Sequence, residues 1–198
     1  PYLAAVEDAF VAAPGLDLRF VRVYGSSVAS RHTQGQLGYG WNHNYDLFVE
    51  ETDDSRVLIH WADGSFRSFI ADDQGGYEGV AGEEGILTQD STGLFQLREP
   101  SGLTYRFGTN EKLASISDTN GNTITAGYSN NSLSTLTHSS GQSLILSYNI
   151  DGKLAKVSDG LGNDTDYTYD SSGRYLEQIT TANSKTTSYN YNKVDHPS

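Results

Sequence analysis

The stretch YTYDSSGR, which runs from Tyr167 to Arg174, brings a carboxylate, a guanidinium and several hydroxyl groups close together in the chain. Such a set could transfer protons, because general acid–base catalysis needs an acid and a base within hydrogen-bond reach. Asp170 and Gly173 are also residue types that reverse a chain between two β-strands. A hairpin turn of a repeat would recur along the sequence, so the spacing of similar stretches decides between the two interpretations.

The other residues with catalytic potential lack the spacing that catalysis requires. The histidines do not pair at the spacing of metal ligands, and no Gly-x-Ser-x-Gly elbow for acyl transfer is present. Adjacent carboxylates, such as Asp53 and Asp54, would point to opposite faces of a strand. We therefore expect a non-catalytic chain without a cofactor. The five histidines are His32, His43, His60, His138 and His196.

Two oxygen-rich stretches resemble parts of calcium-binding loops. The stretch from Asp118 to Asn122 begins like an EF-hand loop, but its glycine is misplaced and no helices are expected beside it. The stretch from Asp159 to Asp166 has a similar composition. Turns use the same residue types, so we expect turns here and no metal site.

Three aromatic residues, Tyr39, Trp41 and Trp61, are candidates for stacking against a sugar ring. The structural interpretation of these residues, and of the regularly spaced tyrosines, is a set of cross-strand aromatic pairs. The regular positions favour the structural interpretation. An exposed patch of Trp and Tyr would favour binding, and burial of Trp41 and Trp61 would count against it.

The composition indicates an all-β chain that does not bind nucleic acid. Its 198 residues include 13 Tyr and 21 Gly, which suit half-buried strands and the tight turns between them. A formal net charge of −12 repels phosphate backbones. Cysteine is absent, and no apolar run approaches the roughly 18 residues of a membrane span. Because the sequence lacks Met and opens at Pro1, we expect a processed chain or an excised piece.

Turn residues recur at a step of about ten residues, which is the length of one short strand and one tight turn. Two steps make a hairpin, and copies of about 20 residues follow one another. The stretch from Asp170 to Gly173 is therefore predicted to be a turn. The copies begin at Phe107, Tyr128, Tyr148 and Tyr169. The positions that carry the repeat are Tyr128, Gly141, Tyr148, Gly152, Leu154, Val157, Gly162, Tyr169, Asp170, Gly173, Ile179 and Tyr191.

Irregular features accompany the repeat. An extra residue near Tyr175 in the fourth copy is predicted to form a β-bulge. The second copy has Asn131 and Ser132 where other copies have a glycine and a basic residue. These departures affect the local geometry of the hairpins more than the assignment of a repeat.

The first hundred residues also favour β-structure, without a repeat. Residues 57–70 and 94–107 are predicted to form hairpins, and residues 72–85, which are acidic and glycine-rich, a loop. Propensity favours a short helix over residues 2–13. Strict alternation of apolar and polar residues predicts one strand face that consists of Trp41, His43, Tyr45, Leu47 and Val49.

We predict a non-repeating β cap at residues 1–106 (the cap) and a hairpin array at residues 107–198 (the array). The two are not expected to be independent domains, because a repeat hairpin cannot bury its apolar face alone. A last strand near Ser188 would leave an open sheet edge, so we expect the array to continue beyond Ser198 in a longer protein. The predicted fold class is all-β, with consecutive antiparallel hairpins in one twisted, curling sheet that the cap closes at its N-terminal end.

The repeats resemble the YD repeats of the Rhs family of large bacterial proteins. The resemblance is carried by Tyr169–Arg174, Tyr148–Lys153 and Ser117–Asn122, and by the block GQLGYGWNHNYD from Gly35 to Asp46. Together these motifs cover nearly the whole chain. The cap residues that match the segment before such repeats are Leu18, Phe20, Arg22, Tyr24, Ser26, Gly38, Gly40, Trp41, His43, Tyr45 and Asp46.

The resemblance implies that the repeats build a β-sheet ribbon which spirals into a hollow shell, as in the related teneurins of animal cell surfaces. In bacteria such a shell typically encloses a toxic C-terminal domain that is delivered to neighbouring cells. For this chain it implies a structural role in a secreted or cell-surface protein, with further repeats and the enclosed domain as partners. The alternative is an adhesion or carbohydrate-binding module that binds a glycan or a protein on a cell surface.

Overall fold

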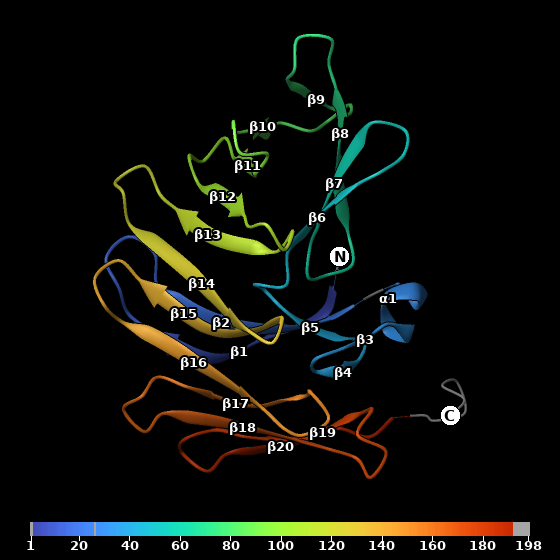
Figure 1. Cartoon of the computed structure of the whole chain (residues 1–198). Coiled ribbons are helices and arrows are strands. Elements are labelled where there is room, and N and C mark those ends of the chain that lie inside the picture. The colour runs from blue at the N-terminus through green and yellow to red at the C-terminus, as the bar shows by residue number, and fades with distance from the viewer. Residues whose placement is uncertain (1, 26, 192–198) are drawn as a thin grey trace.

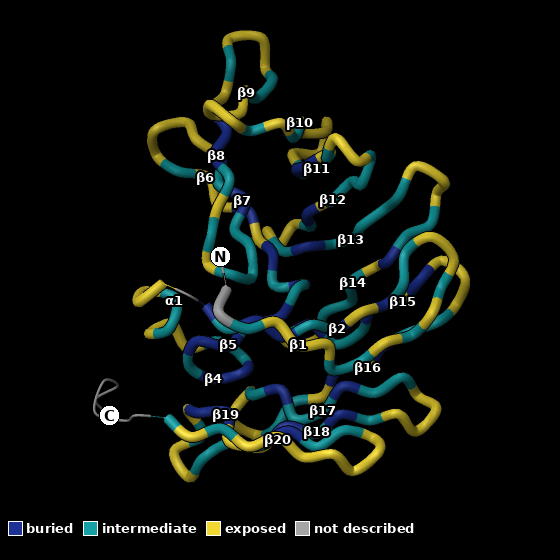
Figure 2. Tube along the Cα trace, turned by 180° about the vertical axis from the view of Figure 1, so that it is seen from behind, coloured by how far each residue is buried: buried dark blue, intermediate teal, exposed yellow. Residues whose placement is uncertain are grey.

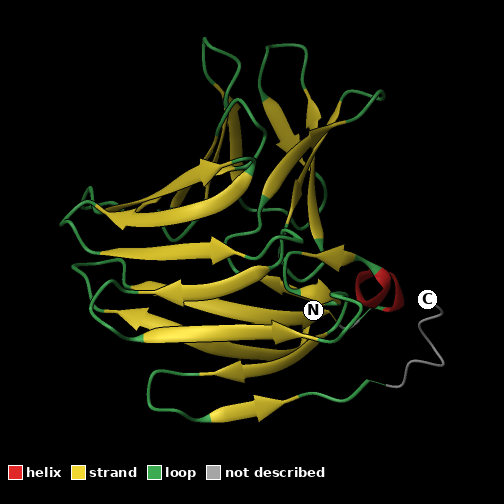
Figure 3. Cartoon of the chain, turned by 60° about the horizontal axis from the view of Figure 1, so that its bottom comes forward, coloured by secondary structure: helices red, strands yellow, loops and turns green. Residues whose placement is uncertain are grey.

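The computed structural model of the chain describes residues 2–25 and 27–191, so Ser26 and His196 lie outside the described residues. Within these ranges the chain forms twenty β-strands and one short helix. The strands are arranged in four antiparallel sheets (Figure 3). The predicted fold class, an all-β chain of consecutive antiparallel hairpins, is confirmed.

A three-stranded sheet begins the chain, in the order β1 (Tyr2–Val11), β2 (Leu18–Gly25) and β5 (Trp41–His43). Between β2 and β5 lie the helix α1 (Val28–His32) and the two-residue strands β3 (Gln34–Gly35) and β4 (Gly38–Tyr39). The helix predicted for residues 2–13 is wrong, because this segment is strand β1. Its ladder with β2 supplies backbone partners along almost the whole segment, and this pairing outweighs a weak helix propensity.

A four-stranded sheet follows, made of β6 (Phe48–Glu51), β7 (Arg56–His60), β8 (Phe66–Ala71) and β9 (Tyr77–Gly79). Strands β7 and β8 form the hairpin predicted for residues 57–70. The loop predicted for residues 72–85 is wrong in part, because it contains β9. This strand pairs with β8, so a polar, glycine-rich segment is held as a strand by its neighbour.

The alternation predicted from Trp41 to Val49 is present in the burial of the side chains. The alternate residues are all at most 5% exposed, although the strand is interrupted between β5 and β6. The predicted face is therefore correct, while the single continuous strand is wrong. The buried members are Trp41, His43, Tyr45, Leu47 and Val49.

An eleven-stranded sheet forms the rest of the molecule, and its strands pair strictly in chain order. The sheet curves around the three-stranded sheet (Figure 1). It starts at Ile86, upstream of residue 107, and includes the hairpin predicted for residues 94–107; the boundary between cap and array stays a prediction. The strands are β10 (Ile86–Gln89), β11 (Phe95–Arg98), β12 (Thr104–Phe107), β13 (Leu113–Ser117), β14 (Thr123–Ser129), β15 (Ser132–His138), β16 (Ser143–Tyr148), β17 (Leu154–Ser158), β18 (Asp164–Tyr169), β19 (Leu176–Thr180) and β20 (Thr186–Ser188).

Each of the four copies interrupts its hairpin ladder at the same place. In the third copy Ser147 pairs with Lys156 and Tyr148 pairs with Leu154, so Ala155 is an extra residue on its strand. A bulge of this kind bends a strand and increases its twist, which accounts for the regular curl of the sheet. The equivalent extra residues of the other copies are Ala114, Ser134 and Glu177.

The extra residue of the fourth copy lengthens a turn and does not create the bulge. The amide of Asp170 donates to the carbonyl of Tyr175 at 3.0 Å, whereas the equivalent amide of Asn149 donates to Lys153 at 2.9 Å. The fourth turn is therefore one residue longer. The bulge predicted near Tyr175 is instead at Glu177 and is shared by all four copies.

The stretch from Tyr167 to Arg174 contains the end of strand β18 and the turn that follows it. Oδ1 of Asp170 accepts hydrogen bonds from the backbone N–H groups of Arg174 and Tyr175, each at 3.1 Å. Gly173 adopts a positive φ of 67°, which its missing Cβ allows. The carboxylate thus closes a turn, and the prediction of a hairpin turn at this stretch is confirmed.

One hydrophobic core joins the sheets. Figure 2 shows that the buried stretches lie within the strands, whereas the turns at the ends of the hairpins are mostly exposed. The core contains Leu18 and Phe20 of β2, Ile59 of β7, and Leu136 and Leu144 of the array. Because these side chains belong to one cluster, the cap and the array bury their apolar faces against each other.

Candidate functional site

The most regular contact in the molecule joins each repeat to the one before it. A tyrosine hydroxyl donates to a leucine carbonyl 15 residues earlier, next to the bulge of the preceding hairpin. Burial raises the pKa of each tyrosine above its usual range, so the hydroxyls stay protonated and can donate. The bonds run from Tyr128 to Leu113 at 2.8 Å, from Tyr148 to Leu133 at 2.7 Å, from Tyr169 to Leu154 at 2.7 Å, and from Tyr191 to Leu176 at 2.8 Å.

The first copy begins with Phe107 in place of tyrosine, and this residue is 2% exposed. Phe107 occupies the same position in its hairpin as the tyrosines do in theirs, because it pairs with Leu113 as Tyr148 pairs with Leu154. The repeat therefore keeps the aromatic ring at its first position and adds the hydroxyl from the second copy onward.

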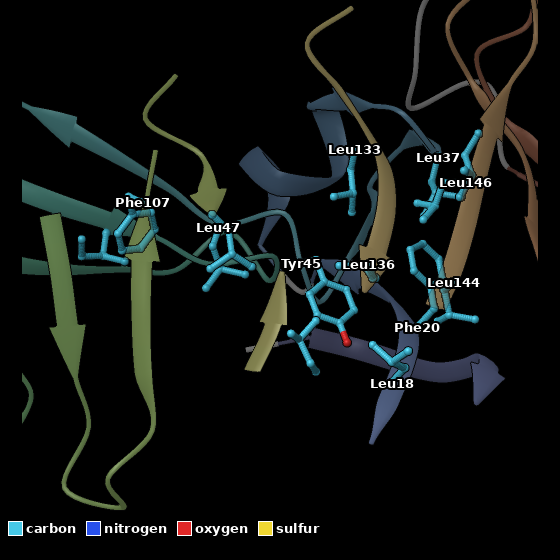
Figure 4. Packing of buried hydrophobic residues seen from close by; sticks show 14 of the residues in the cluster. Leu18, Phe20, Leu37, Tyr45, Leu47, Phe107, Leu133, Leu136, Leu144 and Leu146 are labelled. Carbon is cyan, nitrogen blue, oxygen red and sulfur yellow. The ribbon is translucent and has the colours of Figure 1, made fainter. Parts of the chain in front are cut away.

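The apolar repeat positions form the inner wall of the array. Figure 4 shows Phe20, Leu37 and Tyr45 of the cap beside leucines of β15 and β16. Close packing of these side chains contributes most of the stabilisation expected here, since apolar burial is the dominant favourable contribution to folding. The buried array positions include Leu113, Leu133, Leu136, Leu144, Leu146, Leu154, Val157, Leu176 and Ile179.

The segment from Gln34 to Val49 (the crossing segment) contacts the turn end of every copy. Leu47 accepts a hydrogen bond from the amide of Leu113 in the first copy at 3.0 Å. In the third copy the amide of Leu154 donates to the carbonyl of Gln36 at 2.9 Å. The second and fourth copies are reached by a bond from Gln36 to Ser132 at 2.8 Å and by one from Tyr39 to Arg174 at 2.9 Å.

Gln36 forms hydrogen bonds with the second, third and fourth copies of the repeat. Its Oε1 accepts from the hydroxyl of Tyr148, and its carbonyl oxygen accepts from the hydroxyl of Tyr169, both at 3.2 Å. Lys153 donates to the neighbouring carbonyl of Gly35 at 2.8 Å, and burial lowers the pKa of this lysine. The crossing segment therefore bonds to the same tyrosines that join the repeats.

Glycine is required where the crossing segment meets the fourth turn. Gly38 has a φ of 87°, and a Cβ at this position would lie 2.6 Å from the carbonyl oxygen of Arg174. Gly40 has a φ of 76°, and its Cβ would lie 2.6 Å from the ring of Tyr24. The Gly-x-Gly pair thus lets the backbone approach the array on one side and an aromatic ring on the other.

A buried ion pair joins the first two strands to the array. Arg22 donates from Nε to Oδ2 of Asp8 at 2.8 Å, and the two side chains are 3% and 2% exposed. The same carboxylate oxygen accepts from Tyr167 at 2.8 Å, while Arg22 also donates to the hydroxyl of Tyr189. Burial raises the pKa of Asp8, and the Arg22 guanidinium opposes this effect. A buried pair of this kind is costly to break, since either partner alone would be a charge without compensation.

The predicted ligand-stacking residues are engaged in packing. Trp41 is 5% exposed, donates from Nε1 to the hydroxyl of Tyr191 at 2.9 Å, and packs against Tyr24. Tyr39 is half-buried and packs against Tyr175 with ring centroids 5.3 Å apart. These are the structural pairs expected from aromatic residues. Trp61 is half-buried and meets the ring of Tyr105 edge-on, with centroids 5.3 Å apart. Burial of Trp41 counts against a sugar platform at that residue, whereas Trp61 is not buried in the core.

The remaining residues of the cap motif are also placed at the contact between cap and array. His43 is 3% exposed, its Nδ1 accepts from the amide of Tyr45 at 3.3 Å, and burial lowers its pKa. The neutral ring packs on Phe20 with centroids 5.0 Å apart. Asp46 is half-buried, and the pKa of Tyr128 is raised first by burial and then by the negative charge of Asp46. None of these contacts assembles a set of groups for acid–base catalysis.

The turns with calcium-like sequences are closed by their own side chains. Oδ1 of Asp118 accepts from the amides of Asn120 and Asn122, and the side chain of Asn122 donates to Oδ2. These hydrogen bonds lower the pKa of Asp118. Among the described residues, no group of three or more His, Cys, Asp or Glu side chains is placed to hold a metal ion. In the described ranges, no helical segment has the length and apolar character needed to cross a lipid bilayer.

Sequence reasoning missed two residues that connect the cap to the array. Asp8 was assigned to a helix, and its role is visible only in the structure, where it pairs with Arg22 and accepts from Tyr167. Gln36 lies inside the block from Gly35 to Asp46 but was not singled out. Leu113 and Leu133 occupy the position of Leu154 in earlier copies, so a complete alignment of the four copies would have found them.

Two family models match the chain and together span most of it. A domain of unknown function (DUF6531) matches residues 2–69. The Teneurin YD-shell model matches residues 99–198, which include all four hairpin copies. No curated protein matches the chain. Because the second model covers half of the chain and coincides with its repeats, the chain belongs to the Teneurin YD-shell family.

Proposed function

We propose that this chain forms the first part of the wall of a shell, and that the shell encloses another domain of the same longer protein. The observation that carries the proposal is the contact between the crossing segment and all four repeats. Each repeat after the first is bonded to its predecessor by a tyrosine hydroxyl, and the cap packs against the inner face of these repeats. A structural role of this kind needs no catalytic group.

The mechanism would be containment. Repeats that follow in the longer protein would add strands beside β20 with the same register and the same bulge, so that the wall continues to curl. The cap fills the inner side of the sheet at this end and would close the shell there. Main-chain ladders and tyrosine bonds then resist opening, since main-chain hydrogen bonds and buried polar contacts are costly to break inside a protein.

The resemblance to Rhs proteins suggests the cargo and the place. We propose a secreted or cell-surface protein of bacteria, in which further repeats surround a toxic C-terminal domain that is delivered to neighbouring cells. The partners of this chain would then be the later repeats and the enclosed domain. The predicted division into a cap at residues 1–106 and an array at residues 107–198 is part of this proposal.

The first test is the mass of the native polypeptide in the producing cells, measured by immunoblot with an antibody to this chain. A band far above 21.6 kDa supports a longer shell protein. Limited proteolysis of that protein should then leave a protected C-terminal fragment, which is lost when the protein is unfolded before digestion.

A band near 21.6 kDa would contradict encapsulation, because this many repeats do not surround a domain. The same holds if the C-terminal part of a longer protein is digested as fast before unfolding as after it. In either case the adhesion or carbohydrate-binding module becomes the leading function, and a glycan screen is the next experiment.

A further inference from the structure

The four-stranded sheet of the cap has an apolar face that points away from the core (the outer cap face). Side chains alternate on its strands, so that Ile59 and Phe69 are 0% exposed while Phe66 and Ile70 are 59% and 42% exposed. An exposed group of large apolar side chains is typical of an interaction surface. The apolar residues of the outer cap face are Phe48, Leu58, Phe66, Ile70 and Val80.

Ser68 lies at the centre of the outer cap face and is only 8% exposed. Phe66 and Ile70 flank it along β8. Leu58 pairs with it on β7, and the amide of Val80 donates to its carbonyl at 3.1 Å. Its hydroxyl has no hydrogen-bond partner among the described residues. Buried polar groups of proteins are nearly always hydrogen-bonded, so this hydroxyl indicates that another molecule completes the face.

An acidic rim surrounds this apolar face. Residues 48–86, which contain the sheet, include ten Asp and Glu residues and two Arg residues, so they carry −8 of the formal net charge of −12. Both arginines are already paired with carboxylates. In the part of the chain that the structure describes, the exposed carboxylates of Asp53, Asp73 and Glu78 have no ion-pair partner. The rim is therefore suited to a partner that brings positive charge.

Neither edge of this sheet favours the addition of a strand. The edge strand β6 is bonded to the array, since the amide of Val49 donates to the carbonyl of Glu111 at 2.8 Å and Phe48 forms a β-bridge with Lys112. At the other edge, β9 is three residues long and lies beside β10, and such short edge strands disfavour pairing. A partner is therefore expected to pack on the face of the sheet.

An α-helix fits both the size and the charge of this face. Neighbouring strands are about 4.8 Å apart, so four strands span about 14 Å, and a helix with its side chains is about 10 Å wide. A helix with one apolar stripe buries that stripe against a sheet. A nucleic acid, an anionic membrane or a second copy of this chain would instead bring like charge to the acidic rim.

We propose that the outer cap face binds a basic, amphipathic α-helix of a partner protein. The apolar stripe of the helix covers Leu58, Phe66 and Ile70, and its Lys or Arg residues lie over the acidic rim. Figure 1 shows β9 at the opposite end of the molecule from β20, the edge at which later repeats would follow. The proposal concerns a partner of the cap and does not depend on the enclosed domain.

The probe is a fluorescently labelled synthetic peptide of about 14 residues, about 21 Å long as a helix, with Leu on one helical face and Lys on the others. Its fluorescence anisotropy is recorded while the full chain is titrated. We expect saturable binding that weakens as salt is added, because salt screens the charges.

Control peptides separate the contributions of charge and of the apolar stripe. One has Glu in place of every Lys, and the other has the same composition with its Leu residues spread around the helix. Each should bind at least about tenfold more weakly than the probe, because each lacks one of the two features that the face recognises.

The variant Ile70→Thr removes part of the outer cap face and should weaken binding by at least about fivefold, given the free energy of burying apolar groups. Ile145→Thr is the matched control, because Ile145 is 46% exposed on strand β16 of the array. This variant should leave binding unchanged.

The proposal is overturned if the probe does not bind, if either control peptide binds as tightly, or if the two variants bind alike. A dimer of the chain that Ile70→Thr abolishes would assign the face to a second copy and would also overturn the proposal. Sedimentation of the chain at several concentrations tests for that dimer. If Ile70→Thr fails to fold by circular dichroism, the comparison of the three peptides decides.

Discussion

The array and the cap are built from contacts of different range. In the array one bond recurs, from a tyrosine hydroxyl to a leucine carbonyl 15 residues earlier. The contacts that hold the cap to the array occur once each and join distant residues, such as Asp8 to Tyr167, 159 positions apart, and Gln36 to Tyr169, 133 positions apart. The recurring bond positions each hairpin against the next one. The single contacts position the cap against the inner face of the curled sheet.

The largest loss of stability is expected when the buried ion pair between Arg22 and Asp8 is broken. Arg22→Met leaves Asp8 buried without its cation and should lower the free energy of unfolding by about 3–5 kcal/mol, the usual range for breaking a buried pair. Urea unfolding measures this loss. Arg19→Met is the control, because its pair with Glu7 is exposed and should matter little. Equal effects of the two variants would show that the buried pair does not hold the cap.

The next effect tests the wall of the array. Leu136→Ala removes a side chain that is 0% exposed and should cost about 2–5 kcal/mol, as is usual for such truncations. Leu161→Ala, at a position that is 86% exposed, should change the stability little. Thermal and urea unfolding of both variants give the comparison. A small loss for Leu136→Ala would contradict a shared core of cap and array.

Gly38→Ala tests the close approach of the crossing segment to the fourth turn. The added Cβ meets the carbonyl of Arg174 at a positive φ, and the strain should cost about 1–3 kcal/mol. Gly141→Ala has a φ of 100° but open space around its Cβ, so it carries the backbone strain alone. If the two variants lose the same stability, the backbone of the crossing segment does not lie as close to the carbonyl of Arg174 as the structure places it.

The smallest effect concerns one recurring bond. Tyr148→Phe removes the hydroxyl that donates to Leu133 and should cost about 1 kcal/mol, the net value of a typical hydrogen bond. Tyr77→Phe removes an exposed hydroxyl bonded to Gln89 and should be nearly neutral. Chemical unfolding of the pair of variants resolves the difference. A neutral Tyr148→Phe variant would mean that the ring alone, as in Phe107, joins the repeats.

The array could be predicted from the sequence because its contacts repeat. The tyrosine, leucine and glycine positions return at each hairpin, so the strands and the turns follow from the spacing, and the resemblance to YD-repeat proteins implied the curl of the sheet. The structure corrected only the place of the extra residue, since a longer turn at Tyr175 and a bulge at Glu177 look alike in the sequence.

The cap could be predicted less well because its contacts are made once and over long distances. Strand β1 is set by its ladder with β2 and by the Asp8–Arg22 pair, which local propensity does not reveal. Strand β9 is stabilised by its pairing with β8, although its own residues favour a loop. The alternation from Trp41 to Val49 did predict the buried face, since burial follows the pattern even where the strand is interrupted.

Native-state hydrogen exchange tests the central claim most directly, which is that the crossing segment and the array form one cooperative unit. The amides of Leu113 and Leu154 donate to carbonyls of the crossing segment. The account predicts that they exchange with the same free energy as amides in the centre of the array, so that both open only when the whole chain unfolds. Exchange of these two amides at a much lower free energy, while the array stays protected, would show that the cap leaves the array independently and would contradict the account.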